Sequence, residues 1–338
     1  MKRLSINRLL AGASFLTALL ALQPTWAQDK IRLGLSSVSA TNGSVWVAEE
    51  KGFFKKHGVD VEVIVIGGGG ARVVSSLVAG DLQFSVGGGE GSVRSQLRGA
   101  DTVIVASTMN KGLQRLLARP DIKSHHDLKG KRIGITNFGS AGHLVLVLML
   151  KKWGLRPDQT QILQVGSSPA MLASLDKGGI DAAVLTLPTF FVAEEKGYRV
   201  IGDPAHMDIV YLQNTLESTR PYIRKNREQA LKFMKGYIEG IAYFKKNKRE
   251  SIEILRKKLR IQSEQERDNR YLEMSYNLLA STFYNDVPHP SLKGIQTIID
   301  KLAEEDPKLK DRDPKSFADE SIVKELDDSG FIKALYAK

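Results

Sequence analysis

The chain has 338 residues, contains no cysteine and carries a formal net charge of +11. The lack of cysteine excludes disulfides, a thiolate nucleophile and cysteine-ligated zinc. The length exceeds what a single hydrophobic core usually spans, so two domains or lobes are expected.

Residues 1–27 have the layout of a secretory signal peptide. A basic start, with Lys2, Arg3 and Arg8, precedes the apolar run LLAGASFLTALLAL, and Thr25 and Ala27 provide small residues before a cleavage site. A membrane anchor would need roughly 20 apolar residues to cross the hydrocarbon. The sequence therefore predicts an exported, periplasmic protein with no stable membrane anchor and no cysteine that could carry a lipid.

One order of elements occurs twice along the chain. Residues 30–86 read as strand, helix (44–58), strand, glycine loop, helix and strand, and residues 131–185 repeat the order with a helix from Ser140 to Gly154. Crossovers of this kind form small parallel sheets covered by helices. The apolar runs VIVI (63–66) and AAVL (182–185) are typical of strands buried on both faces. The sequence therefore predicts two similar α/β lobes.

The rest of the chain reads mostly as helix, with a strand-like segment at 208–216 that suits a return from the second lobe to the first. The predicted first lobe is discontinuous and comprises residues 28–110 and 207–338, and the second lobe comprises residues 111–206. Two chain crossings between the lobes would form a natural hinge.

The positive charge is concentrated in the segment 245–260, KKNKRESIEILRKKLR. Ile252, Ile254 and Leu255 mark an inward side of a helix there, and no aromatic residues are interleaved to stack on bases. A solvent-exposed helix face is the favoured interpretation over a docking surface for a partner. No nucleic-acid ligand is expected.

Three segments carry a resemblance to a known family. Ala48, Glu50, Gly52 and Phe53 lead into KKHGVDVEVIVIGG, and DLKGKRIGI (127–135) and LASLDKGGIDAAVLTLPT (172–189) continue the match. Together they resemble exported substrate-binding proteins of ABC importers, in the branch that covers sulfonate, nitrate and thiamine-pyrimidine-precursor binders.

The resemblance implies a bilobal clamshell of the type II periplasmic-binding-protein class. Such a protein holds a small molecule between its lobes and delivers it to a permease that works with an ATPase subunit. A monomer without a cofactor is expected. The same branch holds a pyrimidine synthase with a cysteine-rich motif, so an exported enzyme on this scaffold is the alternative, disfavoured because this chain has no cysteine.

Ligands of open parallel sheets bind beyond the carboxyl ends of the strands. The residues expected to bind the ligand follow predicted strands or open predicted helices; they are Ser37, Asn42, Ser44, Trp46, Gly68, Gly89 and Glu90 in the first lobe and Asn137, Gly139, Ser140, Ser168 and Thr186 in the second. Helices that begin at Ser44 and Ser140 would offer free amides to an anion or a carbonyl oxygen. Capping of those helices is the alternative role.

Two of these residues leave open what the ligand is. Trp46 could stack on a flat ligand or belong to the core. Glu90 would repel an anion, so either it points away from the cleft or the ligand offers a hydrogen-bond donor. Sulfonates, carboxylates and pyrimidine-like molecules all stay open, and the histidines show no metal-ligand spacing.

Overall fold

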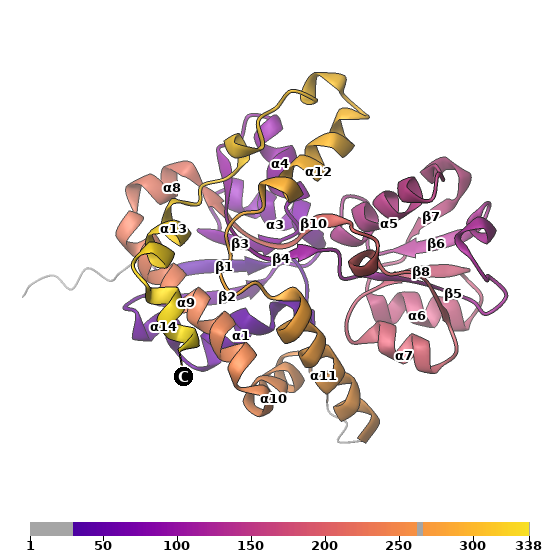
Figure 1. Cartoon of the computed structure of the whole chain (residues 1–338), viewed down its shortest axis with the longest axis horizontal. Coiled ribbons are helices and arrows are strands. Elements are labelled where there is room, and N and C mark those ends of the chain that lie inside the picture. Colours follow the sequence, from indigo (N-terminus) through magenta and orange to yellow (C-terminus); the bar gives the residue numbers. More distant parts are fainter. Residues whose placement is uncertain (1–29, 262–265, 338) are drawn as a thin grey trace, which may run out of the picture.

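The computed structural model describes residues 30–261 and 266–337. The predicted signal peptide, residues 1–27, lies outside the described residues. The described chain forms two lobes, each built on a five-stranded sheet, and they lie beside each other in Figure 1. This confirms the predicted bilobal α/β fold.

Both sheets have the same arrangement of strands. In spatial order, the first-lobe strands are β2 (Val61–Val65), β1 (Ile31–Leu35), β3 (Phe84–Gly87), β10 (Val210–Thr219) and β4 (Thr102–Lys111). The second-lobe strands are β7 (Gln161–Gln164), β6 (Arg132–Ile135), β8 (Ala182–Leu185), β5 (Arg115–Ala118) and β9 (Arg199–Gly202). Strand β1 is parallel to both of its neighbours, β2 and β3, as β6 is to β7 and β8. The repeat predicted from the sequence is therefore a structural repeat.

The sheets are mixed rather than purely parallel, which corrects the sequence-based expectation. In each sheet the strand that follows a passage from the other lobe runs antiparallel to both of its neighbours: β10 lies between β3 and β4, and β5 lies between β8 and β9. The chain passes between the sheets at 112–114 and returns at 203–209. The lobe boundaries at 110/111 and 206/207 stay predictions.

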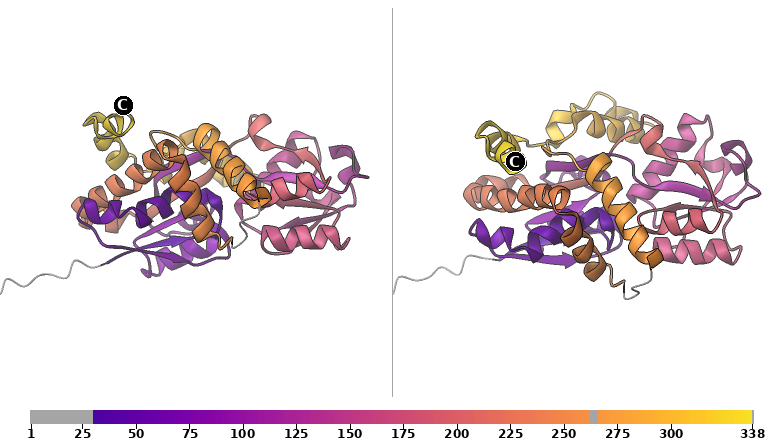
Figure 2. Two further views of the ribbon diagram at one scale, coloured as in Figure 1. Left: turned by 90° about the horizontal axis from the view of Figure 1, so that it is seen from below. Right: turned by 60° about the horizontal axis from the view of Figure 1, so that its bottom comes forward.

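Helices cover the sheets and extend the first lobe (Figures 1 and 2). Those that follow first-lobe strands or the return crossing are α1 (Gly43–Glu50), α2 (Phe53–Lys56), α3 (Gly69–Val78), α4 (Glu90–Leu97), α8 (Arg220–Lys225), α9 (Arg227–Lys246), α10 (Lys248–Lys258), α11 (Glu266–Leu278), α12 (Leu292–Ala303), α13 (Ser321–Asp328) and α14 (Phe331–Tyr336). The second lobe has α5 (Ala141–Lys152), α6 (Ser168–Asp176) and α7 (Thr189–Glu195). None of these described helices is both long and apolar enough to cross a membrane.

Two local predictions differ from the structure. The single helix expected over 44–58 is two helices, because Gly52 has a left-handed backbone, with φ at +70°, between α1 and α2. The run VIVI is not buried on both faces, since β2 is an edge strand whose side chains are partly exposed. AAVL, in contrast, forms the buried strand β8 as expected.

Helix α10 forms most of the basic segment 245–260 and packs against α1. Leu255 is fully buried, while Lys257 and Lys258 form ion pairs with Glu50 and Glu49 at 2.7 and 2.5 Å between the charged atoms. The positive charge of this segment is thus partly neutralised by the first lobe. This agrees with a helix face that packs on its own protein.

Close packing of two glycine loops shapes the floor of the cleft in the first lobe. A side-chain carbon added at Gly91 would stand 2.9 Å from the backbone carbon and oxygen of Gly70, a distance that real side chains do not adopt. Gly68 and Gly89, which belong to these loops, were expected from the sequence to bind the ligand. The structure shows that glycines in the loops at 67–70 and 87–91 allow the two loops to approach each other.

Candidate functional site

A cavity of about 970 Å³ lies between the two lobes. Its walls are formed by residues directly after β1, β2 and β3 in the first lobe and directly after β6, β7 and β8 in the second. It therefore occupies the place where the carboxyl ends of the parallel strands of both sheets meet. Gln114, on the first crossing, and Gln213 and Asn214, in β10 after the return crossing, also line it.

Several of the predicted residues line this cavity: Ser37, Asn42, Gly68, Asn137, Ser140, Ser168 and Thr186. The structure brings residues from both lobes together. The amide nitrogen Nδ2 of Asn137 donates to the carbonyl oxygen of Gly68 across the cleft, at 3.1 Å. This bond joins the two lobes directly at the cavity wall.

Three other predicted side chains of the lining, those of Asn42, Ser140 and Ser168, form hydrogen bonds within their own lobe. Asn42 Nδ2 donates to the carbonyl oxygen of Ser37 at 2.8 Å, and Ser168 Oγ accepts from the amide of Thr186 at 3.1 Å. Ser140 caps α5, with its Oγ accepting from the amide of His143 at 3.2 Å. These bonds fix the loops, and the capping role weighed for Ser140 is the one seen.

The structure places the predicted residues Ser44, Trp46, Gly89, Glu90 and Gly139 outside the lining of the cavity. The α1 helix begins at Gly43, with Asn42 as its N-cap residue, so Ser44 lies inside the helix with only 2% of its surface exposed. Trp46 is 3% exposed and belongs to the core of the first lobe.

Gly89 and Gly139, the two predicted glycines outside the cavity lining, use their backbone amides in hydrogen bonds within the protein. Gly89 donates its amide to the carbonyl oxygen of Leu212 at 3.2 Å and packs against that side chain. Gly139 has a left-handed backbone, and its amide donates to Nδ1 of His143 at 3.2 Å. Both bonds leave the glycine amides unavailable to a ligand.

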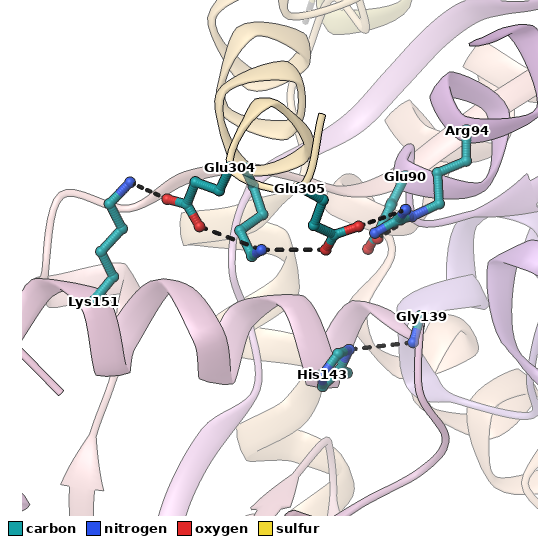
Figure 3. Close-up of polar contacts among 8 residues, drawn as sticks. Glu90, Arg94, Gly139, His143, Lys151, Glu304 and Glu305 are labelled. Carbon is teal, nitrogen blue, oxygen red and sulfur yellow. Dashed lines mark hydrogen bonds and ion pairs between the residues drawn. The ribbon is translucent and has the colours of Figure 1, made fainter. Parts of the chain in front are cut away.

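Glu90 begins α4 and lies beside other charged groups outside the cavity lining (Figure 3). Its Oε1 accepts from Nε of Arg94 at 2.7 Å, and Arg94 also pairs with Glu305 at 3.3 Å. Burial raises the pKa of the Glu90 carboxyl, and the neighbouring Arg94 opposes that shift. The acid that argued against an anionic ligand therefore does not face the ligand cavity.

The same close-up shows an ion pair between the lobes. Lys151 of α5 lies 2.5 Å from Glu304 at the end of α12, and Glu304 in turn contacts Lys301 at 3.3 Å. These exposed pairs have small individual energies. They show that α12 and α5 face each other beside the cavity.

Other residues that line the cavity were not singled out from the sequence. The side chains that bear most on chemistry are those of Arg72, Gln114, Thr189, Gln213 and Asn214. Gln213 and Asn214 belong to β10, which was predicted as a return strand but not as part of the cleft. Gln114 lies on the other crossing, at 112–114. The crossings themselves were the signal that could have identified these residues.

The electrostatic character of the cavity is positive. Among the described residues that line it, Arg72 is the only one with an ionisable side chain, and no described residue forms a hydrogen bond or ion pair with it. Helices α1, α3, α5 and α6 all begin at the cavity, through Asn42, Gly68, Ser140 and Ser167. Helix N-termini carry partial positive charge and free amides, so this wall favours a negatively charged group.

Comparison with known proteins then gives the family. The model of the family described as NMT1/THI5 like matches residues 41–251. The chain belongs to the NMT1/THI5-like family.

Relatives of this NMT1/THI5-like protein include named binding proteins. A protein of Brucella abortus named as a binding protein is 30% identical over 219 residues, which cover 64% of this chain and 67% of that protein. The taurine-binding periplasmic protein of Escherichia coli is 32% identical over 130 residues, which cover 38% of this chain and 40% of that protein.

The fold is shared with a solved periplasmic protein. The periplasmic aliphatic sulphonate binding protein SsuA from Escherichia coli superposes with a TM-score of 0.69 at 20% identity, over 86% of this chain and 91% of that chain. At this identity the likeness shows the fold, which is the periplasmic-binding-protein clamshell that the sequence resemblance implied.

Proposed function

We propose that this protein is a periplasmic solute-binding protein that captures a small organic anion between its two lobes and delivers it to an ABC permease and its ATPase subunit. The observation that carries the proposal is the charge of the cavity. Its described lining has one ionisable side chain, the cation Arg72, and four helices present their N-termini there.

The relatives support the same class of ligand. The names of the Escherichia coli proteins specify taurine and aliphatic sulphonates, both of which are sulfonates. A cavity of about 970 Å³ leaves room for an organic group beyond the anionic one. Glu90 does not line the cavity, so the main argument against an anionic ligand no longer applies.

Capture would proceed by closure of the lobes around the ligand. A ligand that contacts Arg72 and Gly69 in the first lobe and Ser140 and Ser168 in the second favours the closed arrangement, because only there can it bind both walls. The hydrogen bond from Asn137 to Gly68 adds a direct contact between the lobes in that arrangement. The permease would then recognise the closed shape. No catalytic step is part of this proposal.

A panel measured by thermal unfolding tests the ligand class. The purified protein would be heated with sulfonates, carboxylates, nitrate and amino-pyrimidines, each in large excess. A ligand at a hundred times its dissociation constant stabilises the folded state by about 2.7 kcal/mol, which shifts the unfolding midpoint by several degrees.

We expect shifts with organic anions and none with amino-pyrimidines. A shift with amino-pyrimidines alone would contradict the proposal. Turnover of a bound ligand, followed by mass spectrometry of the mixture, would support the alternative of an exported enzyme.

A further inference from the structure

Gln114 is a buried polar side chain in the cavity wall whose carboxamide has no partner among the described residues. It lies on the crossing between β4 and β5, lines the cavity, and is 8% exposed. Its carboxamide forms no hydrogen bond with any described residue, and Oε1 is enclosed without a partner. An enclosed polar atom without a partner costs folding free energy, so one in a binding cavity points to a partner that the ligand brings.

The side-chain amides of the neighbouring residues Gln213 and Asn214, unlike that of Gln114, form hydrogen bonds within the protein. Asn214 donates through Nδ2 to the carbonyl oxygen of Thr41 at 2.9 Å and accepts from Thr108 at 3.1 Å. Gln213 accepts through Oε1 from the amide of Leu113 at 3.4 Å. Asn214 is thus bonded within the first lobe and Gln213 to the first crossing, while the carboxamide of Gln114 has no partner among the described residues.

Asn137, which also lines the cavity, has an acceptor oxygen that likewise lacks a hydrogen-bond partner. Oδ1 of Asn137 is enclosed without a partner, although its Nδ2 is bonded to Gly68. Two residues that line the cavity, which also contains the cation Arg72, thus each hold an enclosed acceptor oxygen without a partner. A ligand that is only an anion would satisfy Arg72 and leave both oxygens unpaired.

We propose that Gln114 is a specificity-determining residue, which recognises an N–H or O–H group of the ligand at a distance from its anionic group. The ligand is then a bifunctional anion, such as an amino- or hydroxy-substituted sulfonate or carboxylate. This inference rests on the proposed function and deepens it. Gln114 also lies at the chain crossing, so the group it recognises sits at the inner wall, where the two lobes are connected.

The test compares matched probes by titration calorimetry. The probes are ethane-, propane- and butanesulfonate and the corresponding carboxylates, each with and without a terminal amino or hydroxyl group. We expect the substituted probe of suitable length to bind the unaltered protein at least tenfold more tightly than its unsubstituted partner. This comparison needs no variant and so does not depend on how a variant folds.

Gln114→Leu keeps the approximate size of the side chain and removes its amide. We expect the variant to lose the preference, so that it binds the substituted and the unsubstituted probe with similar affinity. Gln296→Leu is the matched control, because Gln296 lies on α12 outside the cavity lining and bonds to Asp300.

The possible results separate the two proposals. If no organic anion binds, the proposed function fails. If anions bind but substituted and unsubstituted probes bind equally, or if Gln114→Leu keeps the preference, the role of Gln114 is overturned while the proposed function stands. Thermal midpoints of both variants close to that of the unaltered protein would confirm that the comparison concerns folded protein.

Discussion

Replacing Arg72 with glutamine is expected to weaken the binding of an organic anion about tenfold. Arg72 is the only ionisable side chain in the described lining, and no described residue forms an ion pair with it, so its charge is free for the ligand. A hydrogen bond to a charged group contributes about 1.5–3 kcal/mol. Because Arg72 is exposed, the lower end of that range applies, and about 1.4 kcal/mol corresponds to a tenfold change.

The loss of anion affinity in Arg72→Gln should depend on the salt concentration and on where in the protein the positive charge is removed. In the unaltered protein the affinity should fall as sodium chloride is added, and in Arg72→Gln the dependence should be weaker, because fewer charges take part. Arg98→Gln is the matched control: it removes the same charge from an exposed residue that does not line the cavity. An equal loss of affinity in both variants would show that net charge, rather than a contact in the cavity, is responsible.

Replacing Glu217 with glutamine is expected to stabilise the protein above about pH 7 and to flatten its stability profile between pH 5 and 8. Glu217 is fully buried in β10, and burial raises its pKa to about 8. Its Oε2 accepts from Ser85 Oγ at 2.8 Å, and Oε1 lies 3.0 Å from Thr215 Oγ1. Thr215 Oγ1 can donate to the carbonyl oxygen of Gly87 and accept from a protonated Glu217. The site therefore suits a neutral carboxyl.

The direction of this pH dependence follows from how tightly the folded and the unfolded states bind the proton of Glu217. The folded protein binds this proton more tightly than the unfolded chain, in which the pKa is 4.5. The associated stability is fully present below pH 4.5 and is lost as the pH rises through about 8, with a total on the order of 5 kcal/mol. Glutamine can form the same bonds to Ser85 and Thr215 without a charge, so the variant should lose this dependence.

Equilibrium unfolding at a series of pH values provides the measurement. Glu62→Gln, at an exposed residue of β2, is the control and should leave the pH profile unchanged. A Glu217→Gln variant that is less stable than the unaltered protein at pH 8, or that keeps the same slope, would show that Glu217 is ionised in the folded state.

The sequence predicted the repeated unit because its signal is local. Apolar strands and the glycines that end helices identify β1 to β3 and β6 to β8 in order, and this was enough to expect two lobes. The edge position of β2 could not be predicted, because a strand's neighbours are set by tertiary structure. The same applies to the antiparallel strands β5 and β10, whose partners lie far along the chain.

For the cavity, position after a strand was an informative signal, while residue type alone was not. Asn137, Ser140 and Ser168 were found because they directly follow strands or open helices. Ser44 was assigned to the cleft because it opens a predicted helix, and Trp46 because it could stack on a flat ligand, but α1 begins at Gly43 and both side chains are buried. Arg72 and Gln114 were missed because their place in the cavity wall depends on how the two lobes approach each other.

The most direct test of the central claim is a calorimetric titration with an anion that gave a thermal shift and with its neutral amide or sulfonamide analogue. The two probes have nearly the same shape and differ in charge, so their comparison isolates the electrostatic character of the cavity. The account predicts that the anion binds at one site per chain and at least tenfold more tightly than the neutral analogue. Equal binding of both probes, or tighter binding of the neutral one, would contradict it.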